Sequence, residues 1–262
     1  MDDKPTTFEE YIRWLKERRD FRITDKTQAH YEYVAERVRQ QFKKSRFWKK
    51  LGANLKEYSA EYYIDHGAYQ LLSQKKLPEL KIKPFQKFLH KTFRANASES
   101  NNWVKEPDSG WILPNNWYSR INDIVRTCLV VRYLDGVEFI RKKMETLCKE
   151  DNERCFDCEF KAKEEGYYAA HIYTIEKCEV PKYVGFGTEE VNVKIEIQLT
   201  TQLKDVIVDL LHKHYDERRG KLLTASQELW QWDWASEEFA TNYLGHILHY
   251  VDGMIVGIKE RK

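Results

Sequence analysis

The stretch Val193-Lys194-Ile195-Glu196-Ile197-Gln198-Leu199-Thr200-Thr201 sets the pattern for the rest of the chain. Apolar side chains at 193, 195, 197 and 199 alternate with polar ones at 194, 196 and 198. A period of two predicts a half-buried strand with one apolar and one polar face. An ordinary strand with a solvated polar face would give the same pattern, so other parts of the sequence must decide what this strand does.

Two further stretches give the strand a context. Residues 123–131 read Asp-Ile-Val-Arg-Thr-Cys-Leu-Val-Val, and residues 163–171 read Lys-Glu-Glu-Gly-Tyr-Tyr-Ala-Ala-His. Taken in chain order, the three stretches resemble the synthetase domain of the RelA/SpoT family. Members of that family transfer pyrophosphate from ATP to a 3′-hydroxyl. The resemblance runs from Lys81 to Tyr215 and leaves out the two ends of the chain.

Composition narrows the class of protein. The 262 residues suit one domain with extensions, and 42% hydrophobic with 33% charged residues is typical of a soluble globular protein. No apolar run is long enough to span a membrane, and the first residues lack a signal-peptide pattern, so we expect a cytoplasmic protein without a membrane partner. The net charge of +2 excludes a general polyanion binder. Basic residues do gather locally, at 37–50 and at 81–94.

The five cysteines are an odd number, which argues against a disulfide framework. Cys155 and Cys158 form a single Cys-x-x-Cys motif. A zinc site completed by another cysteine or histidine and a pair of reduced thiols in a strand are both open readings. The absence of a second motif at zinc-finger spacing favours thiols.

Helical patterns occupy both ends of the chain. Thr7 and Glu10 form a capping box, and Val34, Val38 and Phe42 recur at helical spacing. A third helix is expected over residues 59–72, and a last one carries apolar residues between 239 and 254, with His246 and His249 serving packing. We predict an α+β fold of the nucleotidyltransferase type, with a mixed sheet of about five strands among helices. The expected segments are a helical extension (1–78), the synthetase core (79–217) and a C-terminal helical extension packed on the core (218–262).

Residues 97–117 show no periodicity and are rich in Asn, Ser, Pro, Gly and Trp. Loops of this length are often functional. The segment is either an insert over the active site or a surface excursion held by Trp103, Trp111 and Trp117.

The resemblance implies that residues 81–94 bind the phosphates of ATP. Lys81, Lys83 and Lys91 occupy the family's basic positions, and Arg94 follows one helical turn after Lys91. Lys87 stands where the family usually has Ser. Several cations on a helix turn and its lead-in can neutralise a triphosphate.

The strand after that carries an acidic residue and an altered signature. Asp123 matches the Asp of the family's Asp-Ile-x-Gly-x-Arg pattern. Arg126 stands at the Gly position and Cys128 at the Arg position. Whether Arg126 takes over the role of the missing arginine is open.

The remaining matches belong to the part of the family's site that binds the acceptor of the pyrophosphate. Lys163, Gly166 and Tyr167 match the Lys-x-x-Gly-Tyr loop, in which the lysine is a phosphate contact and the tyrosine stacks on the acceptor base, and His171 follows it. Glu196 and Gln198 match the family's Glu-x-Gln, while Thr200 replaces an arginine. His212 and Tyr215 resemble residues that close the family's domain.

The resemblance implies a magnesium-dependent attack by a 3′-hydroxyl on ATP. Asp123 and Glu196 would be the metal ligands and the catalytic pair that includes the base, with Gly166, Tyr167, His171 and Gln198 binding the acceptor. The acceptor would be GDP or GTP, giving alarmones, or an adenosine nucleotide or the 3′ CCA end of tRNA in a toxic variant that could have an antitoxin partner. The alternative is a non-catalytic nucleotide-binding or interaction module on a degenerate synthetase fold.

Overall fold

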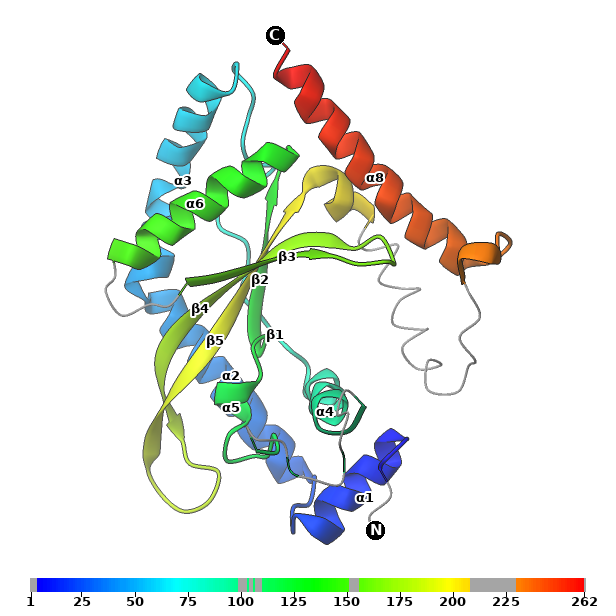
Figure 1. The fold of residues 1–262 in the computed structure, drawn as a ribbon. Coiled ribbons are helices and arrows are strands. Elements are labelled where there is room, and N and C mark those ends of the chain that lie inside the picture. Colours follow the sequence, from blue (N-terminus) through cyan, green and yellow to red (C-terminus); the bar gives the residue numbers. More distant parts are fainter. Residues whose placement is uncertain are drawn as a thin grey trace. The chain divides into compact units, whose positions relative to one another are not determined.

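The computed structural model describes residues 4–98, 103, 106, 110–150, 156–207 and 230–261, which form helices and strands (Figure 1). The α-helices are α1 (Phe8–Arg18), α2 (Asp25–Lys44), α3 (Arg46–Asp65), α4 (Phe85–Phe93), α5 (Trp117–Arg120), α6 (Leu134–Glu150) and α8 (Glu237–Lys259). A π-helical turn, η1 (Arg94–Ser98), follows α4, and a 3₁₀ turn, η2 (Trp230–Trp232), precedes α8. The strands are β1 (Lys81–Ile82), β2 (Val125–Val131), β3 (Phe156–Ala162), β4 (Tyr168–Pro181) and β5 (Thr188–Thr201).

The strands form one five-stranded sheet in the order β1-β2-β5-β4-β3, so β5 is the middle strand. β1 pairs antiparallel with β2, with Lys81 opposite Arg126. β3 pairs antiparallel with β4, with Glu159 opposite His171. The predicted α+β class with a mixed sheet of about five strands is confirmed.

Strand β5 departs from the expected half-solvated pattern. Its apolar residues from Val193 to Leu199 are 0–1% exposed, as alternation requires. The opposite face is also covered, because Glu196 is only 4% exposed and Thr200 only 7%. Lys194 and Gln198 on the same face are half-buried, and residues 188–190 are exposed. The buried carboxylate of Glu196 must therefore find partners inside the protein.

Internal contacts divide the chain into two compact units. The first comprises residues 1–43, 80–126 and 175–195, and the second comprises residues 44–79, 127–174 and 196–262. The predicted segments 1–78, 79–217 and 218–262 stay a prediction, since the second boundary lies outside the described residues.

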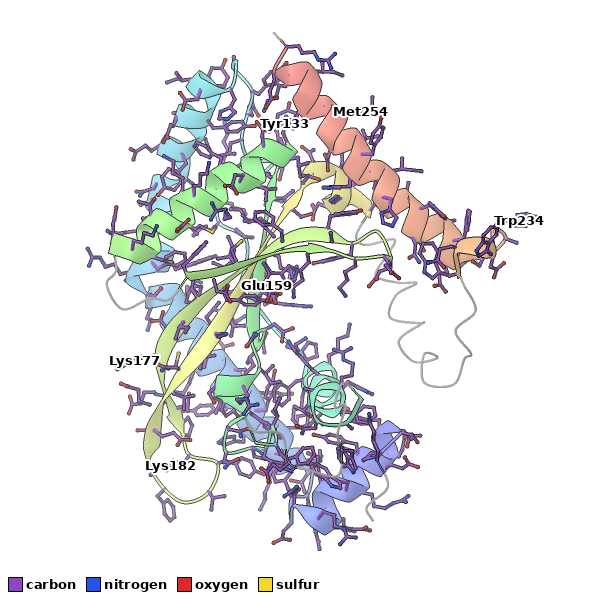
Figure 2. The ribbon with its side chains drawn as sticks, in the orientation of Figure 1. Tyr133, Glu159, Lys177, Lys182, Trp234 and Met254 are labelled. Carbon is purple, nitrogen blue, oxygen red and sulfur yellow. The ribbon has the colours of Figure 1, made fainter. Side chains whose placement is uncertain are left out.

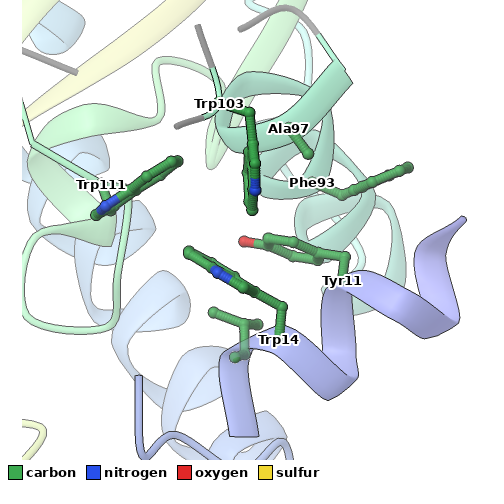
Figure 3. Packing of buried hydrophobic residues seen from close by; sticks show 7 residues of the cluster. Tyr11, Trp14, Phe93, Ala97, Trp103 and Trp111 are labelled. Carbon is green, nitrogen blue, oxygen red and sulfur yellow. The ribbon is translucent and has the colours of Figure 1, made fainter. Parts of the chain in front are cut away.

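In the first unit an aromatic core forms around α1. The predicted capping box is present, with Thr7 accepting from the Glu10 amide and Glu10 accepting from the Thr7 amide. Figure 3 shows the cluster on the inner face of this helix and its neighbours, which contains Tyr11, Trp14, Leu15, Phe93, Ala97, Trp103 and Trp111. The described part of residues 97–117 therefore fits a surface excursion held by its tryptophans, Trp117 being 1% exposed.

In the second unit α3 and α6 are packed together. Helix α3 starts after the Ser45 cap and ends at Asp65, so the helix expected over residues 59–72 was placed too late. The chain leaves the helix at Gly67, whose φ of +70° is in the left-handed region. Leu72 then forms a bridge to Val131 of β2.

Helix α8 is attached through polar residues. It buries Asn242, Gly245, Asp252 and Lys259, whereas Ile247 is 55%, Tyr250 69% and the labelled Met254 of Figure 2 49% exposed. Three of the apolar residues that mark the predicted C-terminal helix are thus exposed. Near its end, Lys259 contacts the Asp135 carboxylate at 2.6 Å and lies 4.6 Å from the ring centre of Tyr133.

Asn96 is the polar link between η1 and the segment after it. Its amide donates to Tyr11 Oη and to the Ile112 carbonyl, both at 2.9 Å, and its oxygen accepts from the Ile112 amide at 2.9 Å. Because Asn96 is 2% exposed, no water can replace these bonds.

We expect Asn96→Ala to lower the free energy of unfolding by about 3 kcal/mol, because it leaves buried backbone groups of Ile112 without partners. Urea denaturation followed by tryptophan fluorescence measures this. The control is Gln28→Ala, whose amide bonds only the exposed Glu32 and whose loss should change stability by about 0.5 kcal/mol or less. Equal stability of the two variants would contradict the role of Asn96.

Candidate active site

Two lysines hold a buried carboxylate in the first unit. Lys83 Nζ lies 2.8 Å from Asp123 Oδ2, and Lys91 Nζ lies 2.8 Å from Asp123 Oδ1. Asp123 and Lys83 are each 7% exposed. The backbone amide of Lys83 donates to the Ile124 carbonyl, which aligns the lead-in of α4 with the start of β2. One carboxylate thus stands between two ammonium groups.

The charges shift one another's pKa values. Burial raises the pKa of Asp123, but the ammonium groups of Lys91 and Lys83 outweigh burial and hold that pKa below its usual value. Burial lowers the pKa of Lys83, Asp123 raises it, and Arg126 lowers it further, with a net lowering. Asp123 therefore stays ionised, and Arg126 acts on the same group of charges.

Two other predicted phosphate ligands, Lys81 and Arg94, belong to the same unit. Lys81 is exposed on β1 and stands opposite Arg126 in the strand pairing. Arg94 lies one turn beyond Lys91, at the point where α4 gives way to η1. On β2 the half-buried positions alternate, so Arg126 and Cys128 are on the same face of the strand.

In the second unit, residues 163–167 form a tight turn between β3 and β4. The Gly166 amide donates to the Lys163 carbonyl at 2.9 Å, and the Lys163 amide donates to the Tyr167 carbonyl at 3.0 Å. Gly166 has a φ of +75°, which favours glycine. The turn brings the Lys163 ammonium to 5.9 Å from the centre of the Tyr167 ring. A cation and an aromatic face are thereby presented by one loop.

A chain of polar groups leads from this loop to β5. Tyr167 Oη lies 2.8 Å from His171 Nε2, and His171 Nδ1 lies 3.4 Å from Glu196 Oε2. A proton on Nδ1 facing the carboxylate is the favourable tautomer, and Nε2 then accepts from the Tyr167 hydroxyl. Gln198 donates from the other side to Glu196 Oε1. His171 and Glu196 are 6% and 4% exposed, so their interaction is shielded from water.

Sequence reasoning missed Tyr173 and Lys161 beside this chain. The ring centres of His171 and Tyr173 are 6.4 Å apart, and Lys161 donates to Tyr173 Oη at 3.2 Å. Burial raises the pKa of Tyr173, and the Glu196 carboxylate adds to the shift although Lys161 opposes it. The alternation of side chains along a strand could have identified Tyr173, because it places residue 173 on the same face of β4 as His171.

The predicted residues thus fall into two groups. Lys83, Lys91 and Asp123 are in contact in the first unit. Lys163, Gly166, Tyr167, His171, Glu196 and Gln198 are connected in the second. His212, Tyr215 and Cys155 lie outside the described residues.

The residues present suit a magnesium ion better than a metal held by protein ligands alone. Among described residues, no group of three or more His, Cys, Asp or Glu side chains could hold a metal. Mg²⁺ in nucleotide sites takes one or two carboxylates together with phosphates and water. Asp123 fits that need because a triphosphate can take over its two lysines. Burial raises the pKa of the Cys158 thiol, which disfavours the thiolate that zinc requires.

No protein-family model and no curated protein matches the sequence. Solved structures do match. The crystal structure of small alarmone synthetase 1 from Bacillus subtilis bound to its product pppGpp has a TM-score of 0.52 at 14% identity, covering 88% of this chain and 96% of that one. A second crystal structure of the same synthetase has a TM-score of 0.50 at 16% identity, covering 90% of this chain and 96% of that one.

This chain has the fold of a small alarmone synthetase. The likeness to the RelA/SpoT synthetase domain inferred from sequence is therefore confirmed at the level of the fold. No helix in the described parts is both long and apolar enough to cross a membrane.

Lys204 is a buried lysine next to the turn at residues 163–167, with its ammonium 3.4 Å from the Tyr168 carbonyl oxygen. Its ammonium lies 2.9 Å from His249 Nδ1 and 4.4 Å from the centre of the Tyr168 ring. Burial lowers the pKa of Lys204 to about 8, although Asp252 opposes the shift. The unfolded chain therefore binds a proton more readily than the folded chain between pH 8 and about 10.4, the usual lysine value.

The free energy of unfolding should consequently rise with pH across this window. The variant Lys204→Met should lack the part of that rise that Lys204 causes. The thermal midpoint measured from pH 7.5 to 10 tests this, taken as the difference between wild type and variant so that other groups cancel. Lys177→Met is the matched control, since Lys177 is exposed and its ion pair with Glu190 lies at the surface. A Lys204→Met protein whose midpoint follows the wild-type pH dependence would contradict the shift.

Proposed function

We propose that the protein is an ATP-dependent pyrophosphokinase that transfers the β,γ-pyrophosphate of ATP to the 3′-hydroxyl of a guanosine nucleotide. The observation that carries the proposal is the series of side-chain contacts from Tyr167 through His171 to Glu196. These contacts occur in a protein with the alarmone synthetase fold. The series supplies an aromatic ring for a base and a buried carboxylate for a hydroxyl proton. The pppGpp bound by the Bacillus subtilis synthetase supports a guanosine product here.

Lys83 and Lys91 are assigned to the ATP phosphates. In the absence of ATP their charges are balanced by Asp123 at 2.8 Å. A triphosphate offers these ammonium groups stronger partners and releases the carboxylate. When bound, Mg²⁺ neutralises phosphate charge, and Asp123 is the side chain we assign to it. Lys81, Arg94 and Arg126 add positive charge around the same group.

Glu196 is assigned to the acceptor hydroxyl. The 3′-oxygen forms a bond to the β-phosphorus, the bond from that phosphorus to the α,β-bridging oxygen breaks, and AMP leaves. The hydroxyl proton passes to the Glu196 carboxylate. Gln198 orients this carboxylate by a hydrogen bond, and His171 Nδ1 lies 3.4 Å from its other oxygen. Its role as a second metal ligand stays a prediction.

Tyr167 is assigned to the acceptor base, with Lys163 as a further phosphate contact. Stacking of a base on an aromatic ring contributes about 1–3 kcal/mol. Because the hydroxyl of Tyr167 is engaged by His171, the ring is held in one orientation. The tight turn at Gly166 sets where the ring is presented.

A tRNA acceptor is the second candidate raised by the basic residues 37–50. The structure supports it less, since Arg39 contacts Glu36 at 2.7 Å and Arg37 donates to Tyr33 at 3.4 Å. Lys50 likewise contacts Glu150 at 2.9 Å. An RNA backbone would have to displace these partners. An antitoxin partner would belong to a toxic variant, with tRNA or an adenosine nucleotide as acceptor.

Glu196→Gln should abolish the transfer of label from [γ-³²P]ATP to GDP or GTP, with a loss of about 100-fold or more in turnover, because the amide cannot accept the proton. The control is Glu190→Gln on the same strand, whose side chain is 65% exposed. Thin-layer separation with GDP, GTP, ATP alone and deacylated tRNA also identifies the acceptor. Full turnover by Glu196→Gln would overturn its assignment, and no transfer to any acceptor would favour a non-catalytic module.

Substitution of Tyr167 should separate stacking from orientation. Tyr167→Ala removes the ring, so the KM for the acceptor should rise about 10- to 100-fold, with the KM for ATP unchanged. Tyr167→Phe keeps the ring but loses the bond to His171, so kcat should fall while the acceptor KM stays near wild type. Tyr33→Ala, at an exposed tyrosine, is the control. Equal rises in both KM values for Tyr167→Ala would contradict a stacking role.

A further inference from the structure

We infer that helix α8 positions the acceptor loop, the turn at residues 163–167 that carries Tyr167. The positioning acts through a backbone contact between Gly166 of the loop and Gly245 of the helix. Both belong to the second unit, where the β3–β4 hairpin reaches toward α8 (Figure 1). The inference rests on the proposed function for what the loop binds. The contact itself does not depend on that function.

The two glycines are needed because the backbones approach very closely. A Cβ atom added to Gly245 would lie 2.5 Å from the Gly166 carbonyl oxygen and 2.9 Å from its carbonyl carbon. A Cβ atom added to Gly166 would lie 2.3 Å from the Asn242 carbonyl oxygen. These atoms are backbone, so no side chain can rotate to make room. An alanine at either position must move the loop or the helix.

His246, the residue after Gly245 on helix α8, forms two further contacts with the same region. His246 Nε2 lies 2.8 Å from the Glu164 carbonyl oxygen, and Nδ1 lies 2.8 Å from Tyr168 Oη. The carbonyl can only accept, so Nε2 carries the proton and a neutral ring accepts from the Tyr168 hydroxyl at Nδ1. The imidazole therefore bridges two residues that flank Gly166 and Tyr167.

The helix is the fixed partner in this contact. Lys204 Nζ lies 2.9 Å from His249 Nδ1, and Thr201 donates to the Asp252 carboxylate. At the C-terminal end Lys259 contacts Asp135. Three separate attachments hold α8, whereas residues 163–167 are a turn. A collision at Gly245 is therefore expected to displace the turn, and Tyr167 with it.

The test substitutes glycines of the same helix. Gly245→Ala should raise the KM for the acceptor about tenfold or more, because misplacement of a binding group by about 1 Å can cost up to about 100-fold. The KM for ATP should stay at the wild-type value. Gly253→Ala is the matched control, since an added Cβ there meets nothing within 4 Å. A Gly245→Ala protein with wild-type acceptor KM, or with equal rises for ATP and acceptor, would overturn the inference.

A second pair guards against a Gly245→Ala protein that does not fold. His246→Ala removes the bridge from a partly exposed side chain, and Ile247→Ala, at a residue 55% exposed, is its control. We expect a rise of several-fold in the acceptor KM for the first variant alone, with no change in thermal midpoint for either. A wild-type acceptor KM for His246→Ala would count against the inference.

Amide hydrogen exchange separates failure of this inference from failure of the proposed function. Exchange of peptides covering residues 163–168 should become faster in Gly245→Ala and stay unchanged in Gly253→Ala. This readout holds even if the wild-type protein transfers pyrophosphate to no acceptor, a result that would refute only the function. Unchanged loop exchange in Gly245→Ala would show that α8 does not position the loop.

Discussion

The structure of the second unit depends on one constraint, which is the burial of the Glu196 carboxylate in the middle strand of the sheet. A carboxylate that is 4% exposed loses most of its hydration, and this loss costs several kcal/mol unless other polar groups replace the water. Gln198 on the same strand and His171 on β4 take that place. Alternation also pins the register, because a slip of one residue would exchange Glu196 with Ile195 or Ile197.

Asp123 in the first unit meets the same cost in a different way. Its partners are two full positive charges, which stabilise the ionised form and lower its pKa. Glu196 has the Gln198 amide and the His171 imidazole among its neighbours. A carboxylate between lysines is suited to exchange partners with a phosphate and a metal. A carboxylate oriented by an amide donor is suited to take a proton at a fixed place.

The sequence predicted those parts of the site that depend on local spacing. Residues 163–171 form one turn and the start of one strand, so Lys163, Tyr167 and His171 had to lie close together. Lys83 and Lys91 lie on a helix and its lead-in, but their contact with Asp123 was not predicted, because Asp123 is 32 positions beyond Lys91 in the sequence. Tyr173 could have been found from period two. The end of α3 at Asp65 was missed because the left-handed turn at Gly67 interrupts an apolar pattern that continues to Leu71.

The attachment of α8 could not be predicted, because the helix contradicts the rule by which amphipathic helices are interpreted. Hydrophobic periodicity assumes that apolar residues face the protein, yet here Gly245 and Asp252 are buried while Ile247 and Tyr250 are exposed. The sequence contains no signal that two glycines 79 positions apart meet backbone to backbone.

The kind of contact has a mechanical consequence. Apolar side chains tolerate small sliding movements, because dispersion contacts have little directional preference. Hydrogen bonds and backbone contacts do not, since each depends on angle and on distances within a few tenths of an ångström. A helix held by Lys259, Asp252 and His246 therefore has one position relative to residues 163–168. A loop that must present an aromatic ring at one fixed place gains more from such a neighbour than from a larger apolar interface.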